Sequence, residues 1–248
     1  MDIIVHGYTG RMGQTICRLA EDGFAGAQVA ARVSVDCPNP GENGCYTKLT
    51  DFTGKADCVV DFSHHAATNA LLDYCVERNL PAVIATTGQT EQEKAAIVEA
   101  AKKIPVFFSA NYSLGVAALA ELAQKAAAMF PEADIEIVET HHNQKLDVPS
   151  GTALLLANKI KVVRPEAEFV IGRHENGRRT KQEIGIHSLR LGNETGTHEI
   201  HISTGSETLT LTHRAENRAL FAEGALRAAG WLVGKPAGLY AMSDLIGG

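Results

Sequence analysis

The sequence predicts an α/β protein with two parts, a doubly wound parallel sheet followed by an α+β unit on a mostly antiparallel sheet. In roughly the first 110 residues, short apolar runs alternate with helical patterns, an order typical of parallel strands joined by right-handed crossover helices. After residue 112, a long helical pattern precedes runs with period-two alternation between turn residues, which favours antiparallel pairing. A chain of 248 residues is long enough for both parts to bury a core.

Five short apolar runs are expected to form the strands of the parallel sheet. A helix after the first run is expected to end at Asp22-Gly23, and Ser63 is expected to cap the helix after the third. Thr90 and Glu93 have the spacing of a capping box, which predicts another helix start. The five runs are residues 3–5, 29–33, 58–60, 83–84 and 106–108.

The second part is expected to combine helices with longer strands. Turn residues at Gly192-Asn193 and Gly205-Ser206 separate its later strands. The expected helices are residues 116–130 and 152–160, and a last helical pattern runs over residues 220–232. The expected strands are residues 135–140, 184–190, 198–203 and 208–214.

The composition restricts the partners of the chain. A net charge of −6 gives no bulk attraction for nucleic acid or an anionic membrane. No stretch approaches the ~20 consecutive apolar residues that cross a bilayer. Met1-Asp2 leads directly into the first apolar run, without the basic start and cleavage site of a signal peptide. We therefore expect a cytoplasmic protein that binds neither nucleic acid nor membrane.

The cysteines argue against disulfides and against a metal site. Their count is odd, no two of them form a Cys-x-x-Cys pair, and no histidine lies at ligand spacing from them. We expect reduced, partly buried thiols and no bound metal. The five residues are Cys17, Cys37, Cys45, Cys58 and Cys75.

A glycine turn, Gly7-x-x-Gly10-x-x-Gly13, follows the first strand and begins a helix. Such glycines let the backbone approach a pyrophosphate, whose charge then faces N–H groups at the helix N-terminus. The spacing departs from the simple fingerprint, so a tight turn that needs glycine only for backbone reasons is the alternative. The position after strand one, with further strand–helix units behind it, favours a Rossmann-like dinucleotide site.

The carboxyl ends of the other strands are the expected neighbours of this ligand, because doubly wound sheets bind ligands at that edge. The end of the second strand leaves the choice of dinucleotide open. Asp36 is suited to accept from ribose hydroxyls, as NAD binding requires, whereas Arg32 or Ser34 would favour a 2′-phosphate. A solvated surface is an equally good interpretation of each. The other strand-end segments are Ser63-His64, Thr86-Thr87-Gly88 and Ala110-Asn111-Tyr112.

The segment from Glu139 to Ala153 gathers two histidines, a lysine and a Ser-Gly-Thr turn that begins a helix. The Gly151 and Thr152 amides are expected to face outward at the helix start, where they suit a carboxylate. Lys145 adds a positive charge and a proton donor, and histidines titrate near neutrality. This combination indicates a dianionic substrate that accepts a hydride and then a proton.

Each of these residues also has a simpler interpretation when it is taken alone. A histidine beside a strand end is usually a structural hydrogen-bonder, Lys145 can pair with Asp147, and Ser150 can be only a helix cap. A metal site is a weaker alternative, because adjacent histidines point apart and no third ligand has suitable spacing. Together, these interpretations leave the clustering unexplained.

The same segment resembles the 4-hydroxy-tetrahydrodipicolinate reductase (dihydrodipicolinate reductase) family. That family's E-x-H-H-x-x-K-x-D-x-P-S-G-T-A pattern is matched throughout residues 139–153. The resemblance extends over the whole chain, and the His-His-x-x-Lys part is highly specific. Further matches are the stretches at residues 7–13, 61–63, 85–88 and 111–116.

The resemblance implies an NADH- or NADPH-dependent oxidoreductase of diaminopimelate and lysine biosynthesis. Its substrate would be the small dicarboxylate 4-hydroxy-tetrahydrodipicolinate, reduced to tetrahydrodipicolinate. It implies a dinucleotide-binding domain of residues 1–112, completed by residues 218–248, and a substrate-binding and oligomerisation domain of residues 113–217. Members are typically homotetramers joined through the sheet of the second domain.

Site residues follow from the resemblance by position. His141 and Lys145 would be the catalytic acid–base pair, with Lys145 as the proton donor. The substrate carboxylates would be bound by His142, Ser150, Gly151 and Thr152. The cofactor would be contacted by Gly7, Tyr8, Thr9, Gly10, Arg11, Met12, Ala85, Thr86, Thr87, Ser109, Ala110, Asn111 and Tyr112.

Two departures from the family pattern concern the adenosine end of the cofactor. Members that accept both dinucleotides often carry an acid followed by arginine after the second strand, where this chain has Ser34-Val35. An arginine is frequent after the Asp-Phe-Ser triplet, where this chain has His64. Both put cofactor preference in doubt and leave the chemistry unaffected.

Three other functions are compatible with parts of the pattern. A different two-domain dehydrogenase, such as a semialdehyde or sugar oxidoreductase, would share the N-terminal half. A thiol-dependent semialdehyde dehydrogenase would need a cysteine in the second part, whereas every cysteine precedes residue 76. A dinucleotide-sensing regulator would have no reason to keep His141, His142 and Lys145 together.

Overall fold

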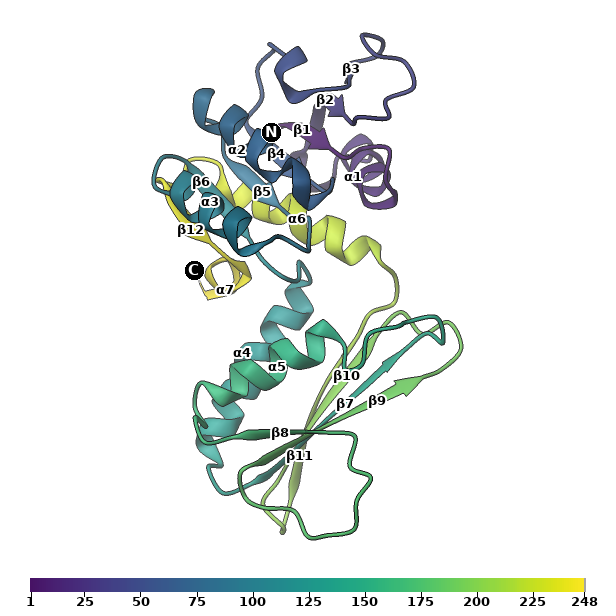
Figure 1. Cartoon of the computed structure of the whole chain (residues 1–248), viewed down its shortest axis with the longest axis vertical. Helices are drawn as coiled ribbons and strands as arrows, with labels where there is room; N and C mark the ends of the chain where they lie inside the picture. The colour runs from purple at the N-terminus through teal and green to yellow at the C-terminus, as the bar shows by residue number, and fades with distance from the viewer. Residues whose placement is uncertain (248) are drawn as a thin grey trace. The chain divides into compact units, whose positions relative to one another are not determined.

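The computed structural model describes residues 1–247 and consists of two compact units (Figure 1). Unit 1 comprises Met1–Ser113 and the C-terminal segment from Ala219, and unit 2 comprises Leu114–Arg218. Each unit has its own sheet and its own apolar core.

Unit 1 is built on a seven-stranded sheet with the order β12-β6-β5-β4-β1-β2-β3, and all its strand pairs are parallel. The strands are β1 Asp2–His6, β2 Gln28–Val33, β3 Cys45–Tyr46, β4 Cys58–Asp61, β5 Ala82–Ile84, β6 Pro105–Phe108 and β12 Gly238–Tyr240. The helices are α1 Arg11–Glu21, α2 Thr68–Glu77, α3 Glu91–Ala101, α6 Ala219–Leu232 and α7 Met242–Gly247, and 3-10 turns lie at η1 Phe24–Gly26, η2 Leu49–Asp51 and η3 His65–Ala67.

The apolar runs of the sequence form the central strands, which are buried on both faces as a parallel sheet requires. The predicted capping box at Thr90 is present at the start of α3, with the Glu93 amide donating to the Thr90 hydroxyl. The prediction omitted β3 and β12. Each has only two or three residues, too few to show any periodicity.

Unit 2 is a five-stranded sheet with the order β11-β10-β7-β9-β8. Its strands are β7 Asp134–His141, β8 Glu168–Ile171, β9 Glu183–Arg190, β10 Thr197–Ser203 and β11 Thr208–Arg214. Helices α4 Leu114–Met129 and α5 Gly151–Lys161 pack on one face, and the core between them includes Ile135, Ile137 and Ile200. Burial alternates along β7, so its odd-numbered residues face the helices and its even-numbered residues face away.

The predicted two-part α/β fold is confirmed, and the second sheet is mixed. β11, β10 and β7 pair antiparallel as expected, whereas β9 and β8 extend the sheet in parallel. A parallel neighbour needs a crossover connection, and the segment after β7 that contains α5 supplies one. β8 is the strand of unit 2 that the sequence pattern missed.

All five cysteines are free thiols, and burial raises the pKa of Cys58 to about 12. Among residues 1–247, no helix combines the length and the hydrophobicity that a bilayer span needs. In the same residues, no group of three His, Cys, Asp or Glu side chains is arranged to hold a metal ion.

Candidate active site

The start of α5 forms one wall of the candidate site in unit 2. Ser150 has an extended backbone and caps the helix, because its Oγ accepts from the Ala153 amide at 3.2 Å. Gly151 is exposed, and a Cβ atom built on it would meet no heavy atom within 4 Å. The first turn of an 11-residue helix therefore opens onto free space, with its partial positive charge directed outward.

A buried carboxylate, Glu139, lies behind this helix start. Its Oε2 accepts from His141 Nδ1 at 2.5 Å and from Arg190 Nη1 at 2.9 Å. Its Oε1 accepts from the Ser150 amide at 3.1 Å and from Arg190 Nη2 at 3.0 Å. The side chain has no solvent exposure, so these partners replace its hydration completely.

The partners of Glu139 determine its ionisation. Burial alone would raise its pKa, but hydrogen bonds from His141, Arg190 and Ser188 outweigh burial and lower the pKa of Glu139 to about 2. The group is therefore an anion at neutral pH. The neighbouring His198 ring, in contrast, is uncharged at neutral pH. Burial and the nearby His141 lower the pKa of His198 to about 3.

His198 contacts both His141 and the helix cap Ser150. Its Nε2 lies 3.1 Å from Ser150 Oγ, and its ring packs edge-on against that of His141 at a centroid distance of 5.2 Å. The structure thus brings together His141 and Ser150, two residues that the sequence singled out. It adds Glu139, Arg190 and His198 as their supports.

The sequence patterns did not single out Arg190 and His198, because their proximity depends on strand register. His141 lies opposite Arg190 in the pairing of β7 with β9, and Glu139 lies opposite His198 in the pairing of β7 with β10. The only available signal was the presence of polar residues in otherwise alternating strands.

Lys145 lies in the loop between β7 and α5, where its Nζ is 2.8 Å from Asp147 Oδ1. The hydrogen bond from Lys145 is the main cause of the lowered pKa of Asp147. The Lys145 side chain is about one-fifth exposed (21%), whereas that of Asp147 is mostly exposed (58%). His142 is half-buried in the same loop, and its carbonyl accepts from the Lys145 amide at 3.2 Å. The pairing of Lys145 with Asp147, considered as an alternative from the sequence, is present.

The glycine turn in unit 1 has two kinds of glycine. Gly7 and Gly13 are required by the backbone, since a Cβ on Gly7 would lie 2.6 Å from Phe62 O and one on Gly13 would lie 2.3 Å from Gly7 O. Gly10 is exposed and would have only one contact, at 3.3 Å, so its lack of a side chain leaves room for a ligand.

The first turn of α1 fits the anionic pyrophosphate of a dinucleotide. Gly10 is its N-cap residue and provides no side-chain cap, and the first turn contains no acidic residue. Arg11 is exposed at this end. These features leave amide donors and a cation for an anion.

A second polar cluster orders the carboxyl ends of the neighbouring strands. Asp61 is buried and accepts from the Ser63 hydroxyl at 2.6 Å and the Thr86 hydroxyl at 2.7 Å. Of the two residues that flank Thr86, Thr87 is exposed and Ala85 is buried. The buried Asp61 carboxylate therefore fixes the segment around Thr86 at the carboxyl edge of the sheet.

The last strand-end segment separates into exposed and buried residues. Ala110 is exposed, and Ser109 and Asn111 are partly exposed. Tyr112 was expected to contact the cofactor, but the residue is only 3% exposed and its hydroxyl donates to Ile84 O at 2.8 Å. Its side chain therefore belongs to the core of unit 1.

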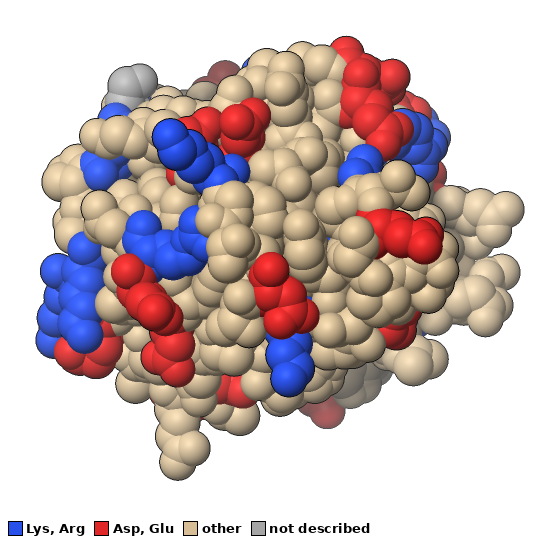
Figure 2. Space-filling view, turned by 90° about the horizontal axis from the view of Figure 1, so that it is seen from above, with Lys and Arg blue, Asp and Glu red and all other residues tan. Residues whose placement is uncertain are grey.

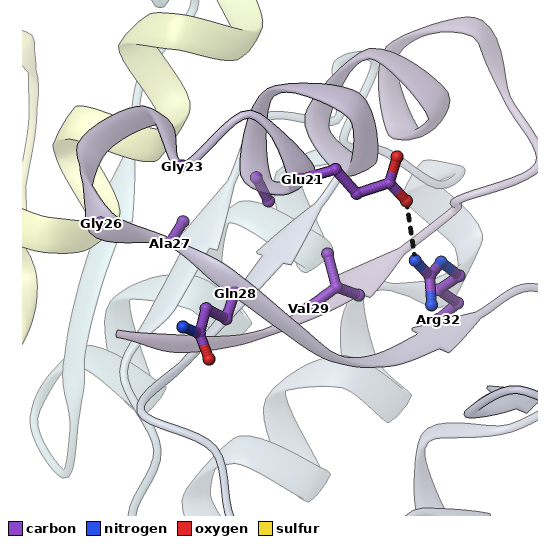
Figure 3. Close-up of a pocket in the computed structure, with 8 residues that line it drawn as sticks. Glu21, Gly23, Gly26, Ala27, Gln28, Val29 and Arg32 are labelled. Atoms are coloured by element: carbon purple, nitrogen blue, oxygen red, sulfur yellow. Dashed lines mark hydrogen bonds and ion pairs between the residues drawn. The ribbon is translucent and has the colours of Figure 1, made fainter.

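Two candidates for the adenosine end differ in their partners. Asp36 is exposed and accepts from the Thr9 hydroxyl at 2.6 Å and from the Ser34 hydroxyl. Arg32, in contrast, pairs with Glu21 at 3.1 Å. Figure 3 shows this pair among the residues that line a hollow between the end of α1, η1 and β2. The volume of the hollow is about 390 Å³. The Arg32 guanidinium is thus already bound by a carboxylate.

The charge on one face of the molecule is mixed. On the face shown in Figure 2, Lys and Arg side chains lie among Asp and Glu side chains, and no broad area of a single sign is visible. Binding of an anion on this face would therefore depend on local groups.

Family models match nearly the whole chain. The model described as "Dihydrodipicolinate reductase, N-terminus" matches residues 1–112, and the one described as "Dihydrodipicolinate reductase, C-terminus" matches residues 115–246.

Full-length relatives are similar to the chain as well. The 4-hydroxy-tetrahydrodipicolinate reductase of Caldanaerobacter subterraneus subsp. tengcongensis is 42% identical over 246 residues, which cover 98% of this chain and 97% of the relative. The reductase of the same name from Akkermansia muciniphila is 42% identical over 252 residues, covering 100% and 98%.

A solved structure supports the same relationship. The dipicolinate-bound dihydrodipicolinate reductase from Paenisporosarcina sp. TG-14 has a TM-score of 0.84 and 26% identity, covering 98% of each chain. The C. glutamicum DAP dehydrogenase has a TM-score of 0.59 at 10% identity, which indicates a shared fold alone. The similarity to the first structure extends over both units.

Proposed function

The chain belongs to the dihydrodipicolinate reductase family, and from that premise we propose how its residues carry out the reaction. Its activity is the reduction of 4-hydroxy-tetrahydrodipicolinate to tetrahydrodipicolinate, a step of diaminopimelate and lysine biosynthesis. The observation that carries our assignment of residues is the buried Glu139 cluster, which holds His141 beside the open start of α5.

NADH or NADPH supplies the hydride when it is bound. The exposed Gly10 and the uncapped start of α1 would hold its pyrophosphate, with Arg11 adding a charge. Residues 85–87 and 109–112 would line the path of the dinucleotide along the strand ends. In this assignment Tyr112 supports the segment from the core, since the residue is buried and its hydroxyl donates to Ile84 O.

The start of α5 would bind the carboxylates of the substrate. Gly151 is exposed with open space beside its Cα, the helix dipole favours an anion at this end, and Thr152 follows in the same turn. Ser150 keeps this end in place as the cap, and His142 would complete the binding site from the preceding loop. Binding the dianion on fixed donors orients its ring for attack.

Lys145 would protonate the reduced ring with the help of His141. The substrate accepts hydride at C4 after water has left the 4-hydroxy form, and electron density moves toward the ring nitrogen. The Lys145 ammonium, held by Asp147 in the loop, is then a charged donor close to the helix start in sequence. A carboxylate of the substrate would compete with Asp147 for the same ammonium.

The finer architecture is also a proposal. We assign dinucleotide binding to residues 1–112 with 218–248, and substrate binding and oligomerisation to residues 113–217. We also propose a cytoplasmic homotetramer that is joined through unit 2. Light scattering measures the molar mass that this proposal requires.

The test of the function is an activity assay on matched lysine variants. Nicotinamide absorbance should fall when the product of dihydrodipicolinate synthase is added to the wild-type protein. Lys145→Ala should lower kcat by about 10²–10⁴-fold, the usual cost of a lost general acid, with unchanged affinity for the dinucleotide.

Lys159→Ala is the control for this experiment. Lys159 is also paired with a carboxylate, Glu121 at 2.6 Å, but it lies in the last turn of α5. Its loss should leave kcat near the wild-type value. Near-normal turnover in Lys145→Ala would refute the role of Lys145.

A further inference from the structure

One carboxylate connects the two chemical parts of the candidate site. Glu139 Oε2 receives the ring N–H of His141, and Glu139 Oε1 receives the backbone N–H of Ser150. Arg190 donates to both oxygens, and its Nη2 also donates to the Asp147 carbonyl at 2.6 Å. The loop that contains Lys145 is therefore tied to the same anion at both of its ends.

We infer that Glu139 is a positioning residue that holds the His141 ring and the carboxylate-binding start of α5 in one fixed arrangement. The inference rests on the proposed function and deepens it. Glu139 has no solvent exposure and does not contact substrate in this scheme. It acts through His141, Ser150 and Arg190.

The geometry fixes the protonation state at one atom of His141. With Nδ1 donating to a carboxylate, Nε2 is the ring atom that remains for proton exchange. A Cβ on Gly196 would lie 3.0 Å from that Nε2, so glycine there leaves the atom uncrowded. The Glu139 carboxylate thereby fixes both the orientation of the ring and the atom that carries the proton.

The groups that face this pair come from several elements. Arg190 of β9 pairs with Glu139, and His198 of β10 packs against the His141 ring. His213 of β11 and the loop residue Lys145 act electrostatically on His198. Arg190 carries the only full positive charge that is paired with Glu139 among the described residues. Removal of the Glu139 charge would therefore leave His141 beside an uncompensated guanidinium.

A second glutamate on the same strand provides a matched control. Glu136 also accepts from an arginine and a histidine, Arg179 Nη1 at 2.6 Å and His187 Nε2 at 2.7 Å. It lies on the face of the sheet that is turned away from α5, and its side chain is 30% exposed. Glu136→Gln removes the same kind of charge from the same kind of partners.

The experiment compares Glu139→Gln with Glu136→Gln in the full chain. Three quantities are measured: the dissociation constant of dipicolinate, the dissociation constant of NADH, and kcat as a function of pH. Glu139→Gln should lower kcat by about 10²-fold and weaken dipicolinate binding by about tenfold, because a misplaced site loses orientation. The pH profile of kcat should also differ from that of the wild type, because the His141 ring loses the carboxylate that orients it. In Glu136→Gln, dipicolinate binding, kcat and the pH profile should stay at wild-type values. The affinity for NADH should be unchanged in both variants.

A third variant separates positioning from folding. Glu139→Gln/Arg190→Gln removes both charges, so no unpaired guanidinium remains buried. This variant should fold and show the same change in the pH profile. A purely structural role predicts wild-type kcat, pH profile and dipicolinate affinity in every folded variant, and that result would overturn the inference.

Failure of the proposed function gives a different result. A wild-type chain that neither turns over the substrate nor binds dipicolinate contradicts the function itself. A wild-type chain that does both, with Glu139→Gln indistinguishable from Glu136→Gln, contradicts only the positioning role.

Discussion

The two Glu–Arg–His groups of β7 contain the same three residue types on opposite faces of one sheet. Glu136, with Arg179 and His187, lies on the face turned away from the helices and remains 30% exposed. Glu139, with Arg190 and His141, lies on the helix-covered face and has no exposure. Only Glu139 also binds the amide of a helix cap, Ser150.

Burial, rather than residue type, therefore determines the role of a Glu–Arg–His group. An exposed ion pair gains little because water screens it and solvates its parts. A buried carboxylate must have every lone pair satisfied, and its partners are consequently fixed in place. Two of the fixed partners of Glu139, His141 and Ser150, are residues that we assign to catalysis and substrate binding.

The largest expected difference between the two groups is in stability. Glu139→Ala leaves Arg190 and His141 without their buried counter-charge and should cost about 3–5 kcal/mol of unfolding free energy. Glu136→Ala, at a partly exposed site, should cost less than about 1 kcal/mol. Urea denaturation of both variants measures the difference. Equal losses would remove the distinction between the two faces.

A smaller effect concerns the pH dependence of stability near the buried group. Burial is the main cause of the low pKa of His198, about 3, whereas a histidine in an unfolded chain titrates near 6.5. Between these values the unfolded chain binds one more proton than the folded chain. The contribution of His198 to stability is therefore lost as pH falls from about 6.5 toward 3, by up to ~1.4 kcal/mol per pH unit.

His198→Gln should reduce this slope in thermal or urea unfolding measured at several pH values. Burial also lowers the pKa of His213, so part of the slope should remain in the variant. An unchanged slope would show that His198 does not titrate as its burial requires.

The smallest expected effect concerns cofactor preference and a third carboxylate, Asp36, which has no cationic partner among the described residues. Asp36 is exposed, and the hydroxyls of Ser34 and Thr9 lower its pKa. Among residues 1–247, no lysine or arginine is paired with Asp36. We expect Asp36 to accept from a ribose hydroxyl and to repel a 2′-phosphate, which favours NADH.

Asp36→Ala should reduce the preference for NADH over NADPH by about tenfold, the scale of one hydrogen bond to a charged group. Calorimetric titration with both dinucleotides measures this ratio. Glu42→Ala removes an exposed acid from the following loop and should leave the ratio unchanged. A wild-type preference for NADPH would contradict the assignment of Asp36.

Much of the fold follows from local patterns in the sequence. Short apolar runs such as residues 58–60 predict buried central strands. Thr90 and Glu93 define a helix start through local hydrogen bonds. The cap at Ser150 is local in the same way, so the start of α5 was predictable to within one residue. Very short strands such as β3 carry no such pattern.

The supports of the candidate site were less predictable. Arg190 and His198 reach Glu139 and Ser150 through strand register, at sequence separations of 51 and 48 residues that no local pattern determines. Tyr112 was predicted to contact the cofactor from its place after a strand and by the family resemblance. Its burial could not be predicted locally, because its ring packs in the core and its hydroxyl donates to backbone carbonyls of two other strands.

The central claim is that the segment from His141 to Thr152 binds the dicarboxylate substrate. Amide hydrogen exchange tests it directly when exchange is compared with and without dipicolinate, with NADH present in both samples. We predict slower exchange in peptides that span residues 141–152, including the Gly151 amide, and unchanged exchange in β8. Protection confined to other peptides, with residues 141–152 exchanging as before, would contradict the account.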